Sequence, residues 1–115
     1  MFVKKNWRKE IEPVELPMFP GSTRRTFSGK EVLIKINEAP PPMTEEVGNP
    51  EERDLHPEEQ INWIMKGSGT MFIGDEIVDV EEGDIILIPS NVPHMFRPRG
   101  NEKVILAGFF AIPKK

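Results

Sequence analysis

Short runs of apolar and β-branched residues recur along this chain between turns rich in glycine, proline and charged residues. The first two runs, 23–27 and 31–37, flank the turn Ser28-Gly29-Lys30 and predict a strand, a turn and a second strand. From residue 54 onward, strand patterns return about every 8 to 12 residues, at 61–66, 70–73, 77–80, 85–88, 95–97 and 104–112. No pattern is typical of a long helix. Many short strands at this spacing predict an all-β sandwich or barrel.

The hydrophobic pattern also predicts which strand faces are buried. Ile85–Ile88 is apolar at every position, which predicts a strand covered on both faces. Large apolar side chains in the remaining runs predict the core or the wall of a pocket: Trp63, Met65, Met71, Phe72, Met95, Phe96, Phe109 and Phe110.

The length of 115 residues predicts a single domain, which we place at 23–115, preceded by an N-terminal arm at 1–22. Prolines prevent a long regular element in the arm, while its Leu16, Met18 and Phe19 can pack on the domain or on a second subunit.

Charge and composition exclude several classes of partner. The net charge of -4 arises from mixed signs, and the basic residues are scattered, which argues against binding to nucleic acid. No apolar run approaches the roughly 18 residues of a membrane span. The chain has no cysteine, so a thiolate metal site is excluded. Together with the polar N-terminus, this predicts a cytoplasmic protein.

The two histidines, His56 and His94, are the candidate metal ligands. Asp54 and His56 are two residues apart, so on a strand they share a face, and Gln60 follows at an even spacing. His94 follows the turn Pro89-Ser-Asn-Val-Pro93, which comes at the end of a strand predicted to be buried. Two imidazoles, a carboxylate and an amide oxygen predict one divalent metal: iron, manganese, zinc, nickel or cobalt.

The segments around these histidines resemble the two signature motifs of the cupin superfamily. Gly48, Asp54, His56, Gln60 and Gly67 hold the spacing of the first motif, and Gly83, Pro89, Asn91, His94 and Pro98 hold that of the second. The resemblance implies a single cupin barrel, a double-stranded β-helix or jelly roll.

Four residues depart from the usual motifs. Asp54 replaces a histidine and Gln60 a glutamate, while Asn91 replaces a glycine and Pro98 an asparagine. The run 56–60, His-Pro-Glu-Glu-Gln, is similar to a variant of small microbial cupins in which the glutamine oxygen is a ligand. The resemblance therefore implies a metal site formed by Asp54, His56, Gln60 and His94.

Several alternatives stay open from the sequence alone. In one alternative the barrel is degenerate, and its histidines merely hydrogen-bond a ligand or each other. Asp54 could be a turn residue paired with Arg53 or another arginine, and Glu58 or Glu59 could replace Gln60 if the strand slips. The segment 38–53 is either a plain solvated loop or a rim over the site.

Substrate recognition has a candidate in Arg97, which follows His94 and could bind a carboxylate, although Arg97 and Arg99 could equally be surface charges. The resemblance implies a metal-dependent isomerase, lyase or dioxygenase acting on a small carboxylate- or carbohydrate-like substrate. The alternative is a barrel that binds a small ligand without turnover, as a sensor or accessory subunit. A homodimer is expected, formed through exchange of the arm.

Overall fold

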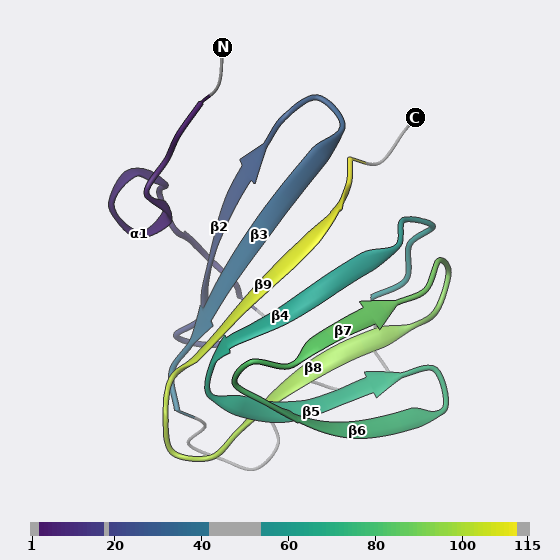
Figure 1. The fold of residues 1–115 in the computed structure, drawn as a ribbon. Coiled ribbons are helices and arrows are strands. Elements are labelled where there is room, and N and C mark those ends of the chain that lie inside the picture. The colour runs from purple at the N-terminus through teal and green to yellow at the C-terminus, as the bar shows by residue number, and fades with distance from the viewer. Residues whose placement is uncertain (1–2, 18, 42–53, 113–115) are drawn as a thin grey trace.

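The computed structural model describes residues 3–17, 19–41 and 54–112, and this part of the chain is almost entirely β-structure (Figure 1). A four-residue helix, α1 (Trp7–Glu10), precedes the strands. The strands are β1 (Val14–Glu15), β2 (Thr23–Ser28), β3 (Val32–Ala39), β4 (Gln60–Lys66), β5 (Ser68–Ile73), β6 (Glu76–Glu81), β7 (Ile85–Ile88), β8 (His94–Arg99) and β9 (Val104–Ala111).

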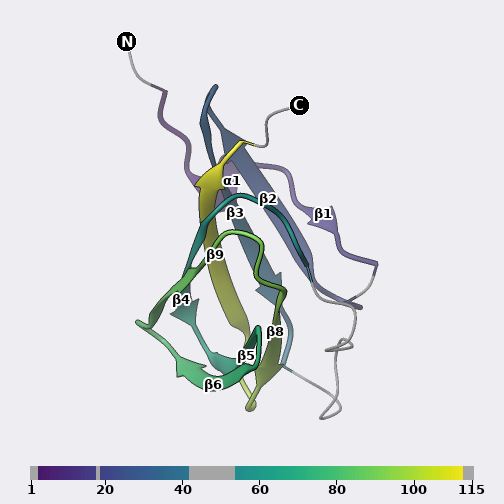
Figure 2. The same cartoon turned by 90° about the vertical axis from the view of Figure 1, so that its right-hand side faces the viewer.

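The strands form two antiparallel sheets that curl toward each other (Figure 2). The larger sheet has the order β1-β2-β3-β9-β4-β7, and the smaller has the order β6-β5-β8. In Figure 1, β2 and β3 extend well beyond the smaller sheet. The predicted all-β barrel of jelly-roll type is confirmed. Among the described residues, no helix is long and apolar enough to cross a membrane.

The main core lies between the two sheets, where alternate residues of each strand point inward. Its centre consists of Ile64, Met71, Val80 and Ile88, and each is at most 5% exposed. The predicted strands match the observed ones within a few residues. Two short elements of the N-terminal segment were not predicted from the sequence, the strand β1 and the helix α1. The first turn of α1 is capped by the Asn6 side chain, which accepts hydrogen bonds from the backbone N–H groups of Arg8 and Lys9.

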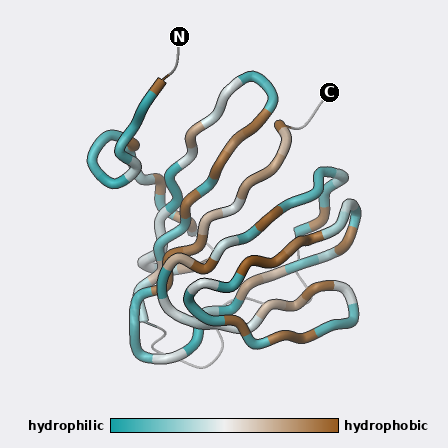
Figure 3. The backbone as a smooth tube through the Cα atoms, viewed as in Figure 1, coloured by the Kyte–Doolittle hydropathy of each residue, from teal (hydrophilic) through white to brown (hydrophobic). Residues whose placement is uncertain are grey.

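The burial of β7 differs from the prediction. Ile88 is fully buried, but Ile85 is 70% exposed and Leu87 is 57% exposed, so one face of this strand is open. Trp63 and Phe109, predicted as core or pocket wall, are also about two-fifths exposed. Figure 3 shows that apolar residues nevertheless dominate the central strands of the larger sheet. Within one chain, the outer face of this sheet is therefore apolar and partly uncovered.

The N-terminal segment covers part of this outer face. Trp7 packs on a second cluster formed by Ile36, Ile105 and Ala107. Arg25 on β2 fastens the segment, because its Nε donates to the carbonyl oxygen of Ile11 and its guanidinium lies 5.5 Å from the Trp7 ring centre. In addition, β1 pairs with β2 of the same chain. Leu16 and Phe19 therefore pack on their own barrel, whereas Met18 lies outside the described residues.

Glu38 connects β2 to the β8–β9 turn through ion pairs with Arg25 and Lys103. Burial alone would raise the pKa of Glu38, but the hydrogen bonds and charges of Lys103 and Arg25 outweigh burial and lower this pKa below 4.5. A carboxylate with a lowered folded-state pKa stabilises the fold above its unfolded-state pKa. That contribution is lost as the pH falls through the folded-state pKa.

We therefore expect Glu38→Gln to lower the free energy of unfolding by about 1 kcal/mol at pH 7, because Lys103 is half-exposed and solvent screens its charge. The difference from wild type should shrink below pH 4.5, where wild-type Glu38 also loses its charge. Urea denaturation across this pH range measures the effect. Glu76→Gln, an exposed charge on β6, is the matched control. A difference that stays constant with pH would contradict the ion-pair explanation.

Candidate metal centre

An isolated β-bridge brings the two histidine segments together. Asp54 and His94 exchange both backbone hydrogen bonds, at 2.9 and 3.0 Å, and thereby join the segment before β4 to the start of β8. Residues directly opposite in such a pair place their side chains on the same face. The Asp54 side chain is therefore on the His94 side of the backbone. His56 follows two residues later in the chain and reaches the same region.

The turn before His94 is held against the first histidine segment. The Asn91 backbone N–H donates to the His56 carbonyl oxygen at 2.9 Å, and the Ser90 hydroxyl donates to the Pro57 carbonyl oxygen. Asn91 has a φ of 59°, a left-handed conformation that asparagine tolerates better than most residues. Asn91 thus adopts the conformation for which a motif glycine is suited, which explains this departure.

Both imidazole rings are oriented by main-chain carbonyl groups. His56 Nδ1 lies 3.0 Å from the Glu58 oxygen, and His94 Nδ1 lies 2.9 Å from the Val92 oxygen. A carbonyl oxygen only accepts, so each neutral ring carries its proton on Nδ1 and keeps a lone pair on Nε2. The ring centres are 5.0 Å apart in an edge-to-face arrangement. This orientation by a second hydrogen bond is the usual one for histidine ligands of metals.

Gln60 contributes an oxygen beside His56. Gln60 Nε2 donates to Asn62 Oδ1 at 2.6 Å, which directs Gln60 Oε1 toward His56 Nε2 at 3.1 Å. Because His56 Nδ1 donates to the Glu58 oxygen, His56 Nε2 and Gln60 Oε1 are both acceptors and have no proton between them. A cation shared by the two atoms removes the conflict, and so does a second proton on the His56 ring. Gly108 leaves room for the pair of amides, because a Cβ there would lie 3.1 Å from both Asn62 Oδ1 and Gln60 Nε2.

The residues fit a divalent metal in part. Two imidazole nitrogens and an amide oxygen are suitable donors, and His94 is only 5% exposed. Within the described ranges, however, no three histidine, aspartate or glutamate side chains are placed so that they could hold a metal together in their observed rotamers. Asp54, an exposed residue, lines the same space as the histidines without completing such a group.

Two adjoining cavities surround these side chains, with volumes of about 250 and 300 Å³. The first contains His56 and the second contains His94, and Asp54 and Gln60 line both. Four polar residues that the sequence did not single out also face the first cavity: Arg24, Lys35, Asn37 and Asn62. For two of them, Lys35 and Asn37, the alternation with isoleucines on β3 could have indicated a shared face. This alternation was misleading, because an apolar strand face is normally the buried one, whereas the apolar face of β3 points outward and its polar face lines the cavity.

The other candidate residues differ in their position relative to the cavities. Arg97 lines neither cavity, and its guanidinium lies 5.3 Å from the Phe72 ring centre. Arg97 and His94 are three residues apart on β8, so their side chains lie on opposite faces of the strand. Glu58 lines the first cavity near His56, with an oxygen 3.8 Å from Nδ1, whereas Glu59 is exposed. Arg53, Gly48 and most of the 38–53 loop lie outside the described residues.

The chain has relatives among curated proteins. An acireductone dioxygenase of Bacillus subtilis is 27% identical over 94 residues, which cover 77% of this chain and 52% of that protein. The chain spans about half the length of the curated relatives that it matches first.

Solved structures share the fold at low sequence identity. A predicted oxalate decarboxylase from Thermotoga maritima has a TM-score of 0.77 at 18% identity, over 96% of this chain and all of that one. An RmlC-like cupin from Shewanella frigidimarina has a TM-score of 0.74 at 15% identity, over 96% and 91% of the two chains. The family model of the cupin domain matches residues 43–111, which is more than half of the chain. The chain therefore belongs to the cupin domain family.

Proposed function

We propose that this protein is a small metal-dependent cupin enzyme acting on a small, oxygen-rich substrate. The observation that carries the proposal is the arrangement of His56 and His94. Each ring donates Nδ1–H to a main-chain carbonyl group and keeps its Nε2 lone pair for another partner. Gln60 Oε1 beside His56 Nε2 adds a third donor.

Each proposed ligand has a defined support. The carbonyl groups of Glu58 and Val92 fix the rings, and Asn62 fixes the Gln60 amide. Asp54 would complete the set by a change of side-chain rotamer, since its bridge to His94 already places it on the correct face. A bound divalent metal would supply Lewis acidity toward a substrate oxygen. These nitrogen and oxygen donors suit iron, manganese, zinc, nickel or cobalt.

The polar lining of the cavity favours a carboxylate- or carbohydrate-like substrate. Reaction classes compatible with such a site are isomerase, lyase and dioxygenase chemistry, and the similarity to acireductone dioxygenases supports the last of these. The second candidate is a barrel that binds a small ligand without turnover. It is favoured by the exposed position of Asp54, which leaves the described donor set without a carboxylate.

Metal analysis of protein purified without an affinity tag tests the proposal. Near one equivalent of bound metal, or reloading to one equivalent after dialysis against a chelating resin, is the expected result. Protein that is metal-free and does not reload would favour the non-catalytic binder. In that case a second proton on His56 would account for its contact with Gln60.

Substitutions of Asp54 distinguish a metal ligand from a surface carboxylate. We expect Asp54→Ala to weaken metal binding by about 10-fold or more if the carboxylate completes the set. Asp54→His should bind metal at least as well as wild type, because it supplies the imidazole that is usual at this motif position. Calorimetric titration with zinc and nickel measures both variants. Glu59→Ala, an exposed neighbouring carboxylate, is the control. Loss of metal in a folded Asp54→His would reject Asp54 as the counterpart of the motif histidine.

We also propose a homodimer formed through the outer face of the larger sheet rather than by exchange of the arm. The arm packs on its own barrel, while the rest of this face keeps exposed apolar side chains: Val32, Ile61, Trp63, Ile85, Leu87 and Phe109. A cytoplasmic location and the boundary between an arm at 1–22 and a domain at 23–115 stay predictions.

A further inference from the structure

Two cationic side chains occupy one wall of the cavity that contains His56. Arg24 on β2 is opposite Asn37 on β3, and Thr26 is opposite Lys35. Arg24 and Lys35 are therefore diagonal neighbours on adjacent strands and share the inner face. Both line the first cavity together with His56 and Gln60. Two cations thus face the candidate metal ligands across a small space.

Neither cation has a carboxylate partner among the described residues. Arg24 donates from Nε to Asn37 Oδ1 at 2.8 Å, which orients the guanidinium, and no partner in the described part of the chain takes its terminal amino groups. Lys35 Nζ lies 5.1 Å from the ring centre of Phe110, and this ring stacks on His56 at 5.8 Å between centres. No described carboxylate oxygen is within 4.0 Å of either cation. The two side chains are therefore positioned, and no carboxylate in 3–17, 19–41 or 54–112 neutralises them.

The charges that line this cavity are segregated. Its carboxylates, Asp54 and Glu58, belong to the segment that carries His56, whereas Arg24 and Lys35 belong to β2 and β3. Burial, and then the charge of Arg24, lowers the pKa of Lys35, while Asp54 partly offsets this. An anion held between the two cations would relieve their repulsion.

We propose that Arg24 and Lys35 form a subsite for the carboxylate group of a small anionic substrate. This inference rests on the proposed function, since it places the rest of the substrate toward His56 and Gln60. The planar guanidinium can bind a carboxylate through two parallel hydrogen bonds, and the lysine adds a point charge. A cavity of about 250 Å³ suits an acid of a few carbon atoms. Arg24 and Lys35 thereby take the role that the sequence assigned to Arg97.

The test uses metal-free full-length protein, so that it does not depend on metal binding. Oxalate is the anionic probe and oxamide is its neutral counterpart of similar shape, and binding is followed by nuclear magnetic resonance. We expect oxalate to bind in roughly the millimolar range and oxamide not to bind measurably. Arg24→Gln and Lys35→Gln should each weaken oxalate binding by about 10-fold.

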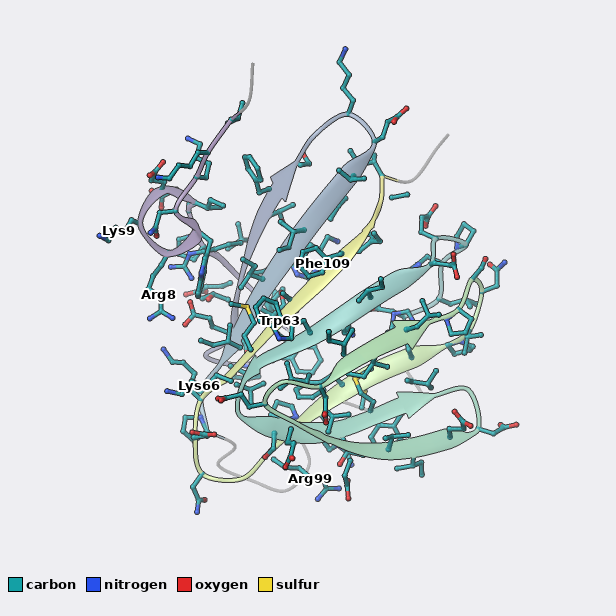
Figure 4. The ribbon with its side chains drawn as sticks, viewed as in Figure 1. Arg8, Lys9, Trp63, Lys66, Arg99 and Phe109 are labelled. Atoms are coloured by element: carbon teal, nitrogen blue, oxygen red, sulfur yellow. The ribbon has the colours of Figure 1, made fainter. Side chains whose placement is uncertain are left out.

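Arg8→Gln and Lys66→Gln are the matched controls, because Figure 4 shows these two cations pointing away from the barrel. Both should bind oxalate as wild type does. Arg24→Lys keeps the charge but loses the planar guanidinium, so its oxalate affinity should lie between those of wild type and Arg24→Gln. This variant replaces Arg24→Gln in the test if Arg24→Gln does not fold. Equal binding of oxamide, or unchanged oxalate binding in both cavity variants, would overturn the subsite.

Zinc titration of the same variants keeps the two proposals apart. Wild-type zinc affinity in Arg24→Gln and Lys35→Gln, together with weaker oxalate binding, supports a subsite separate from the ligands. Oxalate binding that depends on Arg24 in a protein that binds no metal would leave the subsite standing and reject the proposed metal enzyme. Loss of zinc in both variants would show that these cations act on the ligand set, and it would reject the subsite.

Discussion

Replacement of His94 by alanine should remove stoichiometric metal binding and leave the barrel folded. His94 is one of only two histidines in the chain, and its Nε2 has no substitute from another imidazole once His56 is engaged. Loss of a metal ligand should cost more than the 10- to 100-fold that is typical for the residues that merely orient ligands. We therefore expect a decrease in zinc affinity of about 100-fold or more. Elemental analysis and calorimetric titration measure this decrease.

His56→Ala should have a similar effect on the metal and a smaller effect on stability. His94 is buried, so its truncation leaves a space beside β8, whereas the His56 side chain is 26% exposed. Met95→Leu is the control for His94, because it is an adjacent buried residue with an almost unchanged volume. Circular dichroism of each variant establishes folding. A folded variant of either histidine with a full equivalent of metal would remove that residue from the site.

The strand pattern was predictable because it depends on local properties. β-Branched runs and the turns between them predicted β2 to β9 to within a few residues at each end. The spacing of the two histidine motifs was equally informative, because the ring centres of His56 and His94 lie 5.0 Å apart in the structure. Asn91 was more difficult to interpret, since only its φ shows that it takes the conformation suited to the motif glycine.

Which face of a strand is buried depends on partners far away in the sequence. Ile85–Ile88 appeared fully buried because all four residues are apolar, but one chain covers only the side of Ile86 and Ile88. On β3 the polar residues face inward, which reverses the usual rule, so Lys35 was not recognised as a cavity residue. Arg97 was chosen for its nearness to His94, but neighbouring residues of a strand point to opposite faces.

The open half of this outer face is the surface through which we propose that two copies pair. Ile61 is opposite both Leu87 and Phe109, and Trp63 is opposite Ile85, so these five side chains form one surface. Figure 4 shows Trp63 and Phe109 close together on it. Its exposed apolar area is on the order of 500 Å² per chain, near the upper range for a monomer's largest patch and comparable to the apolar part of a standard interface. None of these five side chains is charged, so pairing this surface with a second copy would bury no charge among them.

The double substitution Ile85→Lys and Leu87→Lys should therefore convert the dimer to a monomer without unfolding it. Both side chains are more than half exposed in one chain, so lysines there are solvated in the monomer, but pairing the faces would bury like charges. We expect the dimer to weaken by at least about 100-fold, as measured by sedimentation equilibrium. Ile77→Lys on β6, a 68% exposed isoleucine outside this surface, should leave the dimer intact. A monomeric wild-type protein at micromolar concentration would reject the dimer. A dimer that persists in the double variant would reject this surface and return arm exchange as the explanation.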